Sequence, residues 1–337
     1  MNLLSINNLS VHYLGSQGAT KAVEDVSLNL KEGELLGIVG ESGCGKTTLA
    51  RSITGVIAPT AKIISGEILY KDINILDPKN RARAHNVKWK EISFIPQSAM
   101  NSLDPVYKIK NQMREVLMIR GGFNQKQADE KSSYLFNLVG IDDKRLRDYP
   151  HQFSGGMKQR VAIAMAIALD PKIVIADEPV TALDVIVQRQ ILDLFDKLKK
   201  SLNLSIILVT HDISVIAYTC QKIAVMYAGE IIEMGKVQSV LERPLHPYTM
   251  GLNNAFPDLL SKKSDFLVPI EGFPPNLLNP PTGCRFKMRC PFSQVQCNNK
   301  PEKFKLSDQH QVSCWRENES EQIRIKASQA STWIHNV

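Results

Sequence analysis

The sequence predicts an α/β fold in which helices cover both faces of a parallel sheet. The run ELLGIVG at residues 34–40 is short, apolar and ends in glycine, and the helix-forming segment KTTLARSITG follows it closely. Two more β-branched apolar runs, KIVIADEP at 172–179 and LSIILVTHD at 204–212, lie between segments with helical character. Because these runs are continuous rather than alternating, we expect central strands that are buried on both faces.

The bulk composition is that of a folded globular protein. The chain has 337 residues, of which 43% are hydrophobic and 22% charged, so it can bury one large or two modest cores. Its longest apolar runs, such as residues 161–169, are far shorter than the roughly 20 residues that cross a bilayer. The first residues lack the cationic and apolar regions of a secretory signal, so we expect a cytosolic protein. The formal charge of +7 comes from scattered lysines and arginines, which favours a mildly basic surface over a nucleic-acid footprint.

Three segments are expected along the chain. Helical periodicity between about residues 98 and 169 predicts a helical subdomain inserted into a sheet domain that runs from 1 to 257. Proline, asparagine and lysine then become frequent, and the stretch EGFPPNLLNPPTGC leads into a small tail domain, 258–337, that contains four cysteines. From Arg316 onward the tail is polar, and we expect it to be partly disordered apart from a short IRI run.

A phosphate-binding pattern lies between the first predicted strand and its helix. The sequence GESGCGKTT at residues 40–48 fits G-x-x-x-x-G-K-[ST]. Glycines in such a loop let backbone N–H groups turn toward phosphate oxygens, and the following helix presents its positive N-terminus. Lys46 then reaches the β- and γ-phosphates of ATP, and the Thr47 hydroxyl is placed for Mg²⁺. A glycine-rich structural turn would not account for this lysine and threonine. The expected nucleotide-binding residues here are Gly40, Ser42, Gly43, Cys44, Gly45, Lys46, Thr47 and Thr48.

Two carboxylates, Asp177 and Glu178, end the second predicted strand. They lie at the carboxyl edge of the sheet, where ligands of such folds bind. We expect Asp177 to hold Mg²⁺ through its water shell and Glu178 to polarise the attacking water. A solvated acidic strand end is the common alternative, but a phosphate loop requires such an acidic partner.

Further motifs resemble those of the ATP-binding cassette (ABC) family, from about residue 3 to residue 257. The segment FSGGMKQR at 153–160 is similar to the family signature, with Phe153 and Met157 where leucine and glutamine are more usual. The remaining matches are Gln97 of the glutamine loop, TALD at 181–184 for the D-loop, the switch histidine His211, and Tyr13 where the family stacks an aromatic ring on adenine. The resemblance implies a P-loop NTPase of ABC type.

This resemblance implies a head-to-tail dimer that holds ATP between two subunits. The phosphate loop of one subunit would face the SGG sequence of the other, whose helix N-terminus offers N–H donors and a positive dipole to the γ-phosphate. Hydrolysis would then release the pair. Gln97, which is also an expected Mg²⁺ ligand, and His211 would sense the γ-phosphate. The other implied nucleotide contacts are Ser154, Gly155, Gly156 and Asp184. Cys44 stands where serine or another small residue is frequent, and we expect this thiol beside the phosphate to be sensitive to alkylation.

With no spanning segment expected, an ATPase of this kind must act on other chains. It could be the ATPase subunit of a membrane importer, a soluble ATPase of the same fold that acts on nucleic acid with a zinc module, or a regulatory protein with a degenerate site. Every residue type needed for hydrolysis is present, which argues against the third function. A single phosphate loop in the chain argues against the second, because its members usually carry two cassettes.

The region around RPLHPYTMGLNNAFP at 243–257 and the later pattern G-C-R-F-x-x-R-C-P resemble importer ATPases for peptides, nickel and related solutes. The resemblance implies an ATP-hydrolysing subunit that powers uptake of di- or oligopeptides, with nickel and oligosaccharide uptake as variants. Its partners would be a second ATPase subunit, either a paralogue or a copy of itself, two transmembrane permease subunits and, indirectly, an extracellular solute-binding protein. No nucleic acid is expected. The protein would lie peripherally at the cytoplasmic face of the cell membrane.

Four cysteines near the end of the chain follow the spacing C-x5-C-x6-C-x16-C. They are Cys284, Cys290, Cys297 and Cys314. Structural zinc typically uses C-x2–4-C pairs, whereas four thiolates on wider loops are compatible with a [4Fe-4S] cluster. We hypothesise such a cluster, a choice that the family resemblance supports more than the spacing does. Zinc, with His310 replacing one thiol, and free inert cysteines are the alternatives. Arg285, Lys287 and Arg289 are expected to lower the thiol pKa values.

Overall fold

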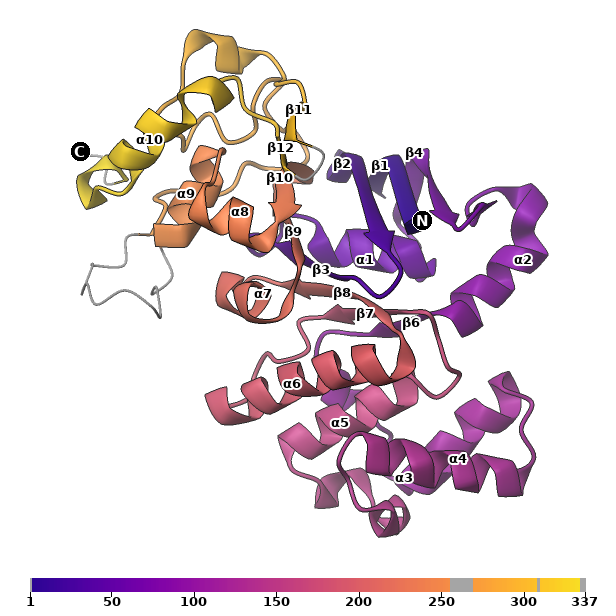
Figure 1. Cartoon of the computed structure of the whole chain (residues 1–337). Coiled ribbons are helices and arrows are strands. Elements are labelled where there is room, and N and C mark those ends of the chain that lie inside the picture. The colour runs from indigo at the N-terminus through magenta and orange to yellow at the C-terminus, as the bar shows by residue number, and fades with distance from the viewer. Residues whose placement is uncertain (1, 255–268, 308–309, 334–337) are drawn as a thin grey trace. The chain divides into compact units, whose positions relative to one another are not determined.

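The computed structural model describes residues 2–254, 269–307 and 310–333 (Figure 1). The chain forms two compact units. The first comprises Met1–Ser5, Asn29–Leu35 and Ile68–Val209, and the second comprises Ile6–Leu28, Leu36–Glu67 and Thr210–Val337.

The first unit is built on three parallel strands. They are β6 (Ile92–Ile95), β7 (Ile173–Asp177) and β8 (Ser205–Thr210), with β7 in the middle. Ile173 of β7 pairs with Ile92 on one side and with Ser205 on the other. Every residue of β7 and β8 is buried, as their continuous apolar runs predict. Both strands were expected from the sequence and are confirmed.

All regular elements between residues 99 and 166 are helical, joined by short loops, which confirms the helical periodicity predicted there. Helix α3 packs on α4, α4 on α5, and α5 on both α6 and β6 (Figure 1). The α-helices are α3 (Ile109–Glu115), α4 (Gln125–Leu138), α5 (Gly155–Ala166) and, beyond β7, α6 (Val185–Leu202). Shorter elements of this unit are β5 (Ile73–Asn74), α2 (Arg81–Asn86), 3-10 turns at Pro78–Asn80, Ala99–Asn101, Asp143–Arg147 and Pro150–Gln152, and π-helical turns at Val87–Glu91 and Val116–Arg120.

The second unit contains the first predicted strand, β3 (Leu35–Val39), and its helix, α1 (Lys46–Thr54), and both are confirmed. Strand β3 runs parallel to β9 (Lys222–Tyr227), which pairs antiparallel with β10 (Glu230–Lys236). A second sheet contains, in this order, the neighbouring strands β2 (Gly18–Lys31), β1 (Asn2–Gly15) and β4 (Ala61–Tyr70). Most residues of these three strands also belong to the second unit. The remaining α-helices before residue 255 are α7 (Ile213–Thr219), α8 (Val237–Glu242) and α9 (Pro247–Asn254).

Residues 269–307 and 310–333, hereafter the extension, add to this second unit. Strand β12 (His310–Val312) pairs with β10, and β11 (Phe304–Ser307) pairs with β12, so the extension continues the sheet. Helix α10 (Ser320–Ala327) packs on α9. The expected disorder after Arg316 is therefore wrong for the described part of this tail. Only two of its buried residues, Ile323 and Ala327, are apolar, which is too few to give a clear apolar pattern. Short 3-10 turns lie at Val295–Asn298, Glu317–Glu319 and Ala330–Thr332.

Candidate functional site

The phosphate loop, residues 40–45, connects β3 to α1 and lies tightly against its neighbours. Gly40 and Gly45 have φ values of 159° and 101°. A Cβ atom added to them would lie 2.0 Å from the carbonyl oxygens of Met226 and Ala22, respectively. Only glycine fits such close backbone approaches. The loop is thus seated directly on strands β9 and β2, and its N–H groups lead into the N-terminus of α1.

Lys46 lies against the loop backbone. It is 5% exposed, and its Nζ donates hydrogen bonds to the carbonyl oxygens of Gly40 at 2.7 Å and Glu41 at 2.9 Å. The hydroxyl of Tyr13, a residue expected to stack on adenine, lies 3.1 Å from Oγ1 of Thr48. The structure therefore places three predicted site residues, Tyr13, Lys46 and Thr48, together at the N-terminus of α1, where the helix dipole favours an anion.

Cys44 is enclosed rather than accessible. Its side chain is 1% exposed, and burial raises the pKa of its thiol even though Lys46 Nζ lies 3.7 Å from the sulfur. A buried, protonated thiol is a poor nucleophile. The structure therefore argues against the expected sensitivity to alkylation.

In the first unit, Asp177 and Glu178 end strand β7. Asp177 is fully buried, and the backbone of Glu178 has a left-handed φ of 49°. The Glu178 N–H donates to the carbonyl of Val209 at 2.8 Å. Its carboxylate oxygen Oε2 accepts hydrogen bonds from Gln97 Nε2 at 3.4 Å and from Thr181 Oγ1 at 3.0 Å. The side chains of Gln97 and Thr181 thus both contact the proposed base, and the sequence predicted a role at the γ-phosphate only for Gln97.

The signature and D-loop residues begin two helices. Ser154 caps α5 by accepting a hydrogen bond from Met157 N–H at 3.4 Å, and Asp184 caps α6 by accepting one from Val187 N–H at 2.9 Å. Gly155 and Gly156 form the first turn of α5, and a Cβ at Gly156 would lie 2.5 Å from Cγ1 of Val187. Ser154 and Gly155 are exposed, which leaves this helix N-terminus accessible to an anion in the part of the chain described. His211, the predicted switch residue, follows β8 and is also exposed.

The four C-terminal cysteines line a single cavity in the second unit. Its wall also contains Phe286, Phe292 and Trp315, the cations Lys287 and Arg316, and His246 with Pro247. His246 is 1% exposed, its Nδ1 accepts a hydrogen bond from Tyr248 N–H, and its Nε2 has no hydrogen-bond partner in the described structure. Among the described residues, no three His, Cys, Asp or Glu side chains are grouped closely enough to hold a single metal ion. His310, considered as a zinc ligand, instead places its Nε2 2.8 Å from the buried carboxylate of Glu233.

The expectation that the neighbouring cations lower the pKa values of the thiols is wrong. Burial raises the pKa of Cys284 to about 11 and that of Cys314 to about 12, and it raises the pKa of Cys290 further. All three cations have other partners. Arg285 and Arg289 are 6% and 8% exposed and form ion pairs with carboxylates elsewhere in the second unit, and Lys287 donates to Asn298.

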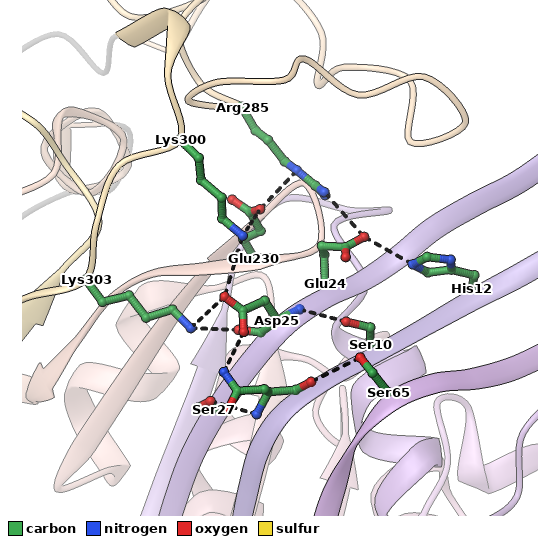
Figure 2. Close-up of polar contacts among 11 residues, drawn as sticks. Ser10, His12, Glu24, Asp25, Ser27, Ser65, Glu230, Arg285, Lys300 and Lys303 are labelled. Carbon is green, nitrogen blue, oxygen red and sulfur yellow. Dashed lines mark hydrogen bonds and ion pairs between the residues drawn. The ribbon is translucent and has the colours of Figure 1, made fainter. Parts of the chain in front are cut away.

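Cations of the extension face carboxylates of β2 and β10 (Figure 2). Lys303 Nζ lies 3.1 Å from Asp25 Oδ2, and Lys300 Nζ lies 3.5 Å from both Asp25 Oδ2 and Glu230 Oε1. Arg285 Nε lies 3.3 Å from Glu230 Oε1, and its Nη1 donates to the carbonyl of Ala228. The positive charge beside the cysteines therefore attaches the extension to the rest of its unit.

Three further residues at the phosphate loop were missed. The Glu41 carboxylate pairs with Arg289, and the Glu41 N–H donates to the hydroxyl of Tyr248. Tyr248 belongs to the HPYT sequence, which was noted only as a resemblance. No local pattern signals these contacts, since their partners lie more than two hundred residues away.

Within the described parts of the chain, no helix combines the length and the apolarity that crossing a membrane requires.

Comparison with known proteins identifies the family. Residues 23–181 match the model described as "ABC transporter", and residues 232–297 match "Oligopeptide/dipeptide transporter, C-terminal region".

Curated relatives match nearly end to end. The chain is 40% identical to the dipeptide transport ATP-binding protein DppD of Bacillus subtilis, over 97% of this chain and 98% of that one. It is 44% identical to the oligopeptide transport ATP-binding protein OppD of Salmonella typhimurium, over 89% of both. Among solved structures, the dimeric post-hydrolysis state of the ATP-binding cassette MJ0796, bound to ADP and Pi, is 28% identical, with a TM-score of 0.60, over 69% of this chain and 98% of that one. The chain therefore belongs to the ABC transporter family, among the ATP-binding proteins of the oligopeptide/dipeptide transporter type.

Proposed function

We propose that this chain hydrolyses ATP to drive the uptake of di- or oligopeptides through a separate membrane permease. The observation that carries the proposal is the phosphate loop seated on β9 and β2 with Lys46 against it, in a chain whose C-terminal region matches the oligopeptide/dipeptide type. The relatives named above are peptide transporters, which favours peptides over nickel or oligosaccharides.

Each site residue has a proposed role. The loop N–H groups and Lys46 bind the phosphates, Tyr13 contacts adenine, and Glu178 removes a proton from the attacking water. Asp177 and Gln97 in the first unit and Thr47 in the second are the residues that would hold Mg²⁺, which would neutralise charge on the phosphate oxygens. Gln97 already contacts Glu178, so a change at the Mg²⁺ site reaches the base directly. His211 senses the γ-phosphate.

The working unit is a dimer of ATPase subunits on two permease subunits, at the cytoplasmic face of the membrane. The exposed N-terminus of α5, with Ser154, Gly155 and Gly156, supports a role in closing a partner's nucleotide site. Asp184 contributes from the start of α6. The dimeric MJ0796 cassette supports the arrangement. The second subunit is either a paralogue or another copy of this chain.

The test is reconstitution of the chain with its permease subunits, companion ATPase and solute-binding protein in proteoliposomes. We expect ATP turnover that rises when a di- or oligopeptide is supplied with the binding protein, and none with Glu178→Gln. Stimulation by nickel or an oligosaccharide, but not by peptides, would contradict the peptide assignment.

We also propose that Cys284, Cys290, Cys297 and Cys314 hold a [4Fe-4S] cluster that organises a small C-terminal domain. The cavity that all four line supports this, as does the partnerless Nε2 of His246 in its wall. The loops between the cysteines are wider than the C-x2–4-C pairs typical of structural zinc, and four thiolates can hold a [4Fe-4S] cluster. When bound, the cluster would replace four thiols by four iron–thiolate bonds and so stabilise a region with little core of its own.

Anaerobic purification followed by iron, sulfide and zinc analysis tests this assignment. We expect about four irons and four sulfides per chain, visible absorbance from iron–thiolate bonds, and their loss in Cys314→Ser. A colourless protein with one zinc per chain, or with no metal, would contradict the cluster.

A further inference from the structure

The extension contacts the phosphate loop at the loop's second residue, Glu41. Arg289 Nη1 donates to Glu41 Oε2 at 2.8 Å, and the N–H of Glu41 donates to the hydroxyl of Tyr248 at 3.0 Å. The carbonyl of Glu41 accepts from Lys46 Nζ at 2.9 Å. All three polar groups of this residue are therefore bonded, and the partner of its carboxylate, Arg289, lies beyond the nucleotide-binding domain predicted for residues 1–257.

Arg289 is itself held firmly. Its guanidinium donates to the carbonyl oxygens of Ile270 at 3.1 Å and Glu271 at 3.0 Å, and to the hydroxyl of Tyr227 at 3.3 Å. The side chain is 8% exposed. A planar guanidinium with four such acceptors cannot turn away from Glu41 without losing several hydrogen bonds.

The same short stretch reaches the cysteine cavity. Phe286, three residues before Arg289, packs edge-on against Tyr227 and Tyr248, with ring centroids 5.2 and 5.4 Å apart. Arg289 directly precedes Cys290 in the sequence. The position of Arg289 is therefore set by packing around the cavity and not by the phosphate loop alone.

Glu41 raises an electrostatic problem for a site that binds polyphosphate. Its carboxylate belongs to the predicted phosphate loop, and a carboxylate close to phosphate groups repels them, more strongly in a partly buried environment than in water. Arg289 supplies the opposite charge at 2.8 Å. Without it, the loop would present a negative charge to a negative ligand.

We propose that Arg289 is a positioning residue for ATP binding that acts through Glu41: its guanidinium holds and neutralises the Glu41 carboxylate, so that the phosphate loop does not present a negative charge to the phosphates. The proposal rests on the proposed nucleotide site. It assigns the extension a task in the ATPase cycle, because Arg289, which contacts the phosphate loop, lies after the ATP-binding cassette.

The test is a double-mutant cycle on the full-length chain, read as the dissociation constant of Mg·ATP. Arg289→Ala should weaken binding roughly 5- to 100-fold, and should weaken ADP binding less, because ADP carries less charge. Glu41→Gln alone should bind Mg·ATP at least as well as wild type. The double variant should recover affinity to within about threefold of Glu41→Gln, because removal of the carboxylate removes the need for its counter-charge.

The matched control is Lys303→Ala, which breaks another ion pair of the extension, with Asp25, away from the loop. It should leave the dissociation constant unchanged. If Arg289→Ala does not fold, Arg289→Met keeps the aliphatic stem and takes its place in the cycle.

Wild-type affinity in folded Arg289→Ala, a double variant no better than Arg289→Ala, or an equal loss in Lys303→Ala would each overturn the proposal. Failure of the wild-type chain to bind Mg·ATP would instead contradict the proposed function itself.

Discussion

Gln97 Nε2 donates a hydrogen bond to Oε2 of Glu178 at 3.4 Å, so the glutamine loop contacts the proposed catalytic base directly. Thr181 donates to the same oxygen at 3.0 Å. The backbone of Glu178 is left-handed, a conformation that costs about 1–3 kcal/mol for a residue other than glycine. The bond from its N–H to Val209 stabilises that geometry and places the carboxylate at the end of β7.

Replacement of the base gives the first prediction. Glu178→Gln should lower ATP turnover by about 10²- to 10⁴-fold, because an amide cannot accept the proton from water. The dissociation constant of Mg·ATP should stay within about threefold of wild type, since the same hydrogen-bonding shape is kept. Steady-state hydrolysis and nucleotide titration measure the two quantities. Thr181→Val, which removes a partner but keeps the carboxylate, should cause a smaller loss. Wild-type turnover in Glu178→Gln would show that another group is the base.

The thiol of Cys44 should resist modification in the folded protein. Because the side chain is 1% exposed and burial raises its pKa, alkylation by iodoacetamide should be at least about tenfold slower than in urea-unfolded protein. Mass spectrometry of the peptide that contains Cys44, sampled over time, gives both rates. Equal rates in the two states would mean that the loop opens readily.

A buried carboxylate, Glu233, should be important for stability. It is fully buried and accepts hydrogen bonds from the N–H groups of Leu245 and His246 at 2.8 and 2.9 Å, while His310 Nε2 lies 2.8 Å away. Glu233→Gln replaces one acceptor oxygen by a donor, so the free energy of unfolding should fall by about 2 kcal/mol. Urea unfolding measures this change. The exposed Glu242→Gln is the control and should have little effect; equal changes in the two variants would refute the role.

The ion pair between Arg114 and Asp129 should make stability depend on pH. Arg114 donates two hydrogen bonds of 2.5 Å to the Asp129 carboxylate, and these lower the pKa of Asp129 from 3.8 to about 2. Because the folded-state pKa is the lower one, the stabilisation is present above about pH 4 and is lost as the pH falls toward 2.

Asp129→Asn should therefore lower the free energy of unfolding by about 1 kcal/mol at pH 7, a modest value for a partly exposed pair. The difference from wild type should shrink between pH 4 and pH 2. Denaturant unfolding across this range checks both statements. Asp193→Asn, which breaks an exposed pair within α6, should change stability by less than about 0.5 kcal/mol. A difference that persists at pH 2 would rule out titration of Asp129 as its source.

Local sequence predicted the three strands, the phosphate-loop helix and the helical segment, because each depends on periodicity and on glycine positions within a few residues. The roles expected of Lys46 and Glu178 from residue type and spacing stay predictions. Local sequence did not predict that α10 is helical, since only Ile323 and Ala327 mark its buried face. Because Arg285 and Arg289 are close to the cysteines in the sequence, we expected them to lower the thiol pKa values. In the folded chain these arginines instead form ion pairs with carboxylates.

The sequence by itself therefore determined that this chain has a phosphate loop followed by a helix, carboxylates at the end of a buried strand, and four cysteines in its last sixty residues. Only the tertiary structure decided that Arg289 meets Glu41 across 248 positions, and that the four thiols line one cavity beside His246. The physical reason is the distance along the sequence between the residues that decide each feature. Backbone conformation and helix capping follow from adjacent residues, whereas a buried charge finds its partner through the packing of the whole unit.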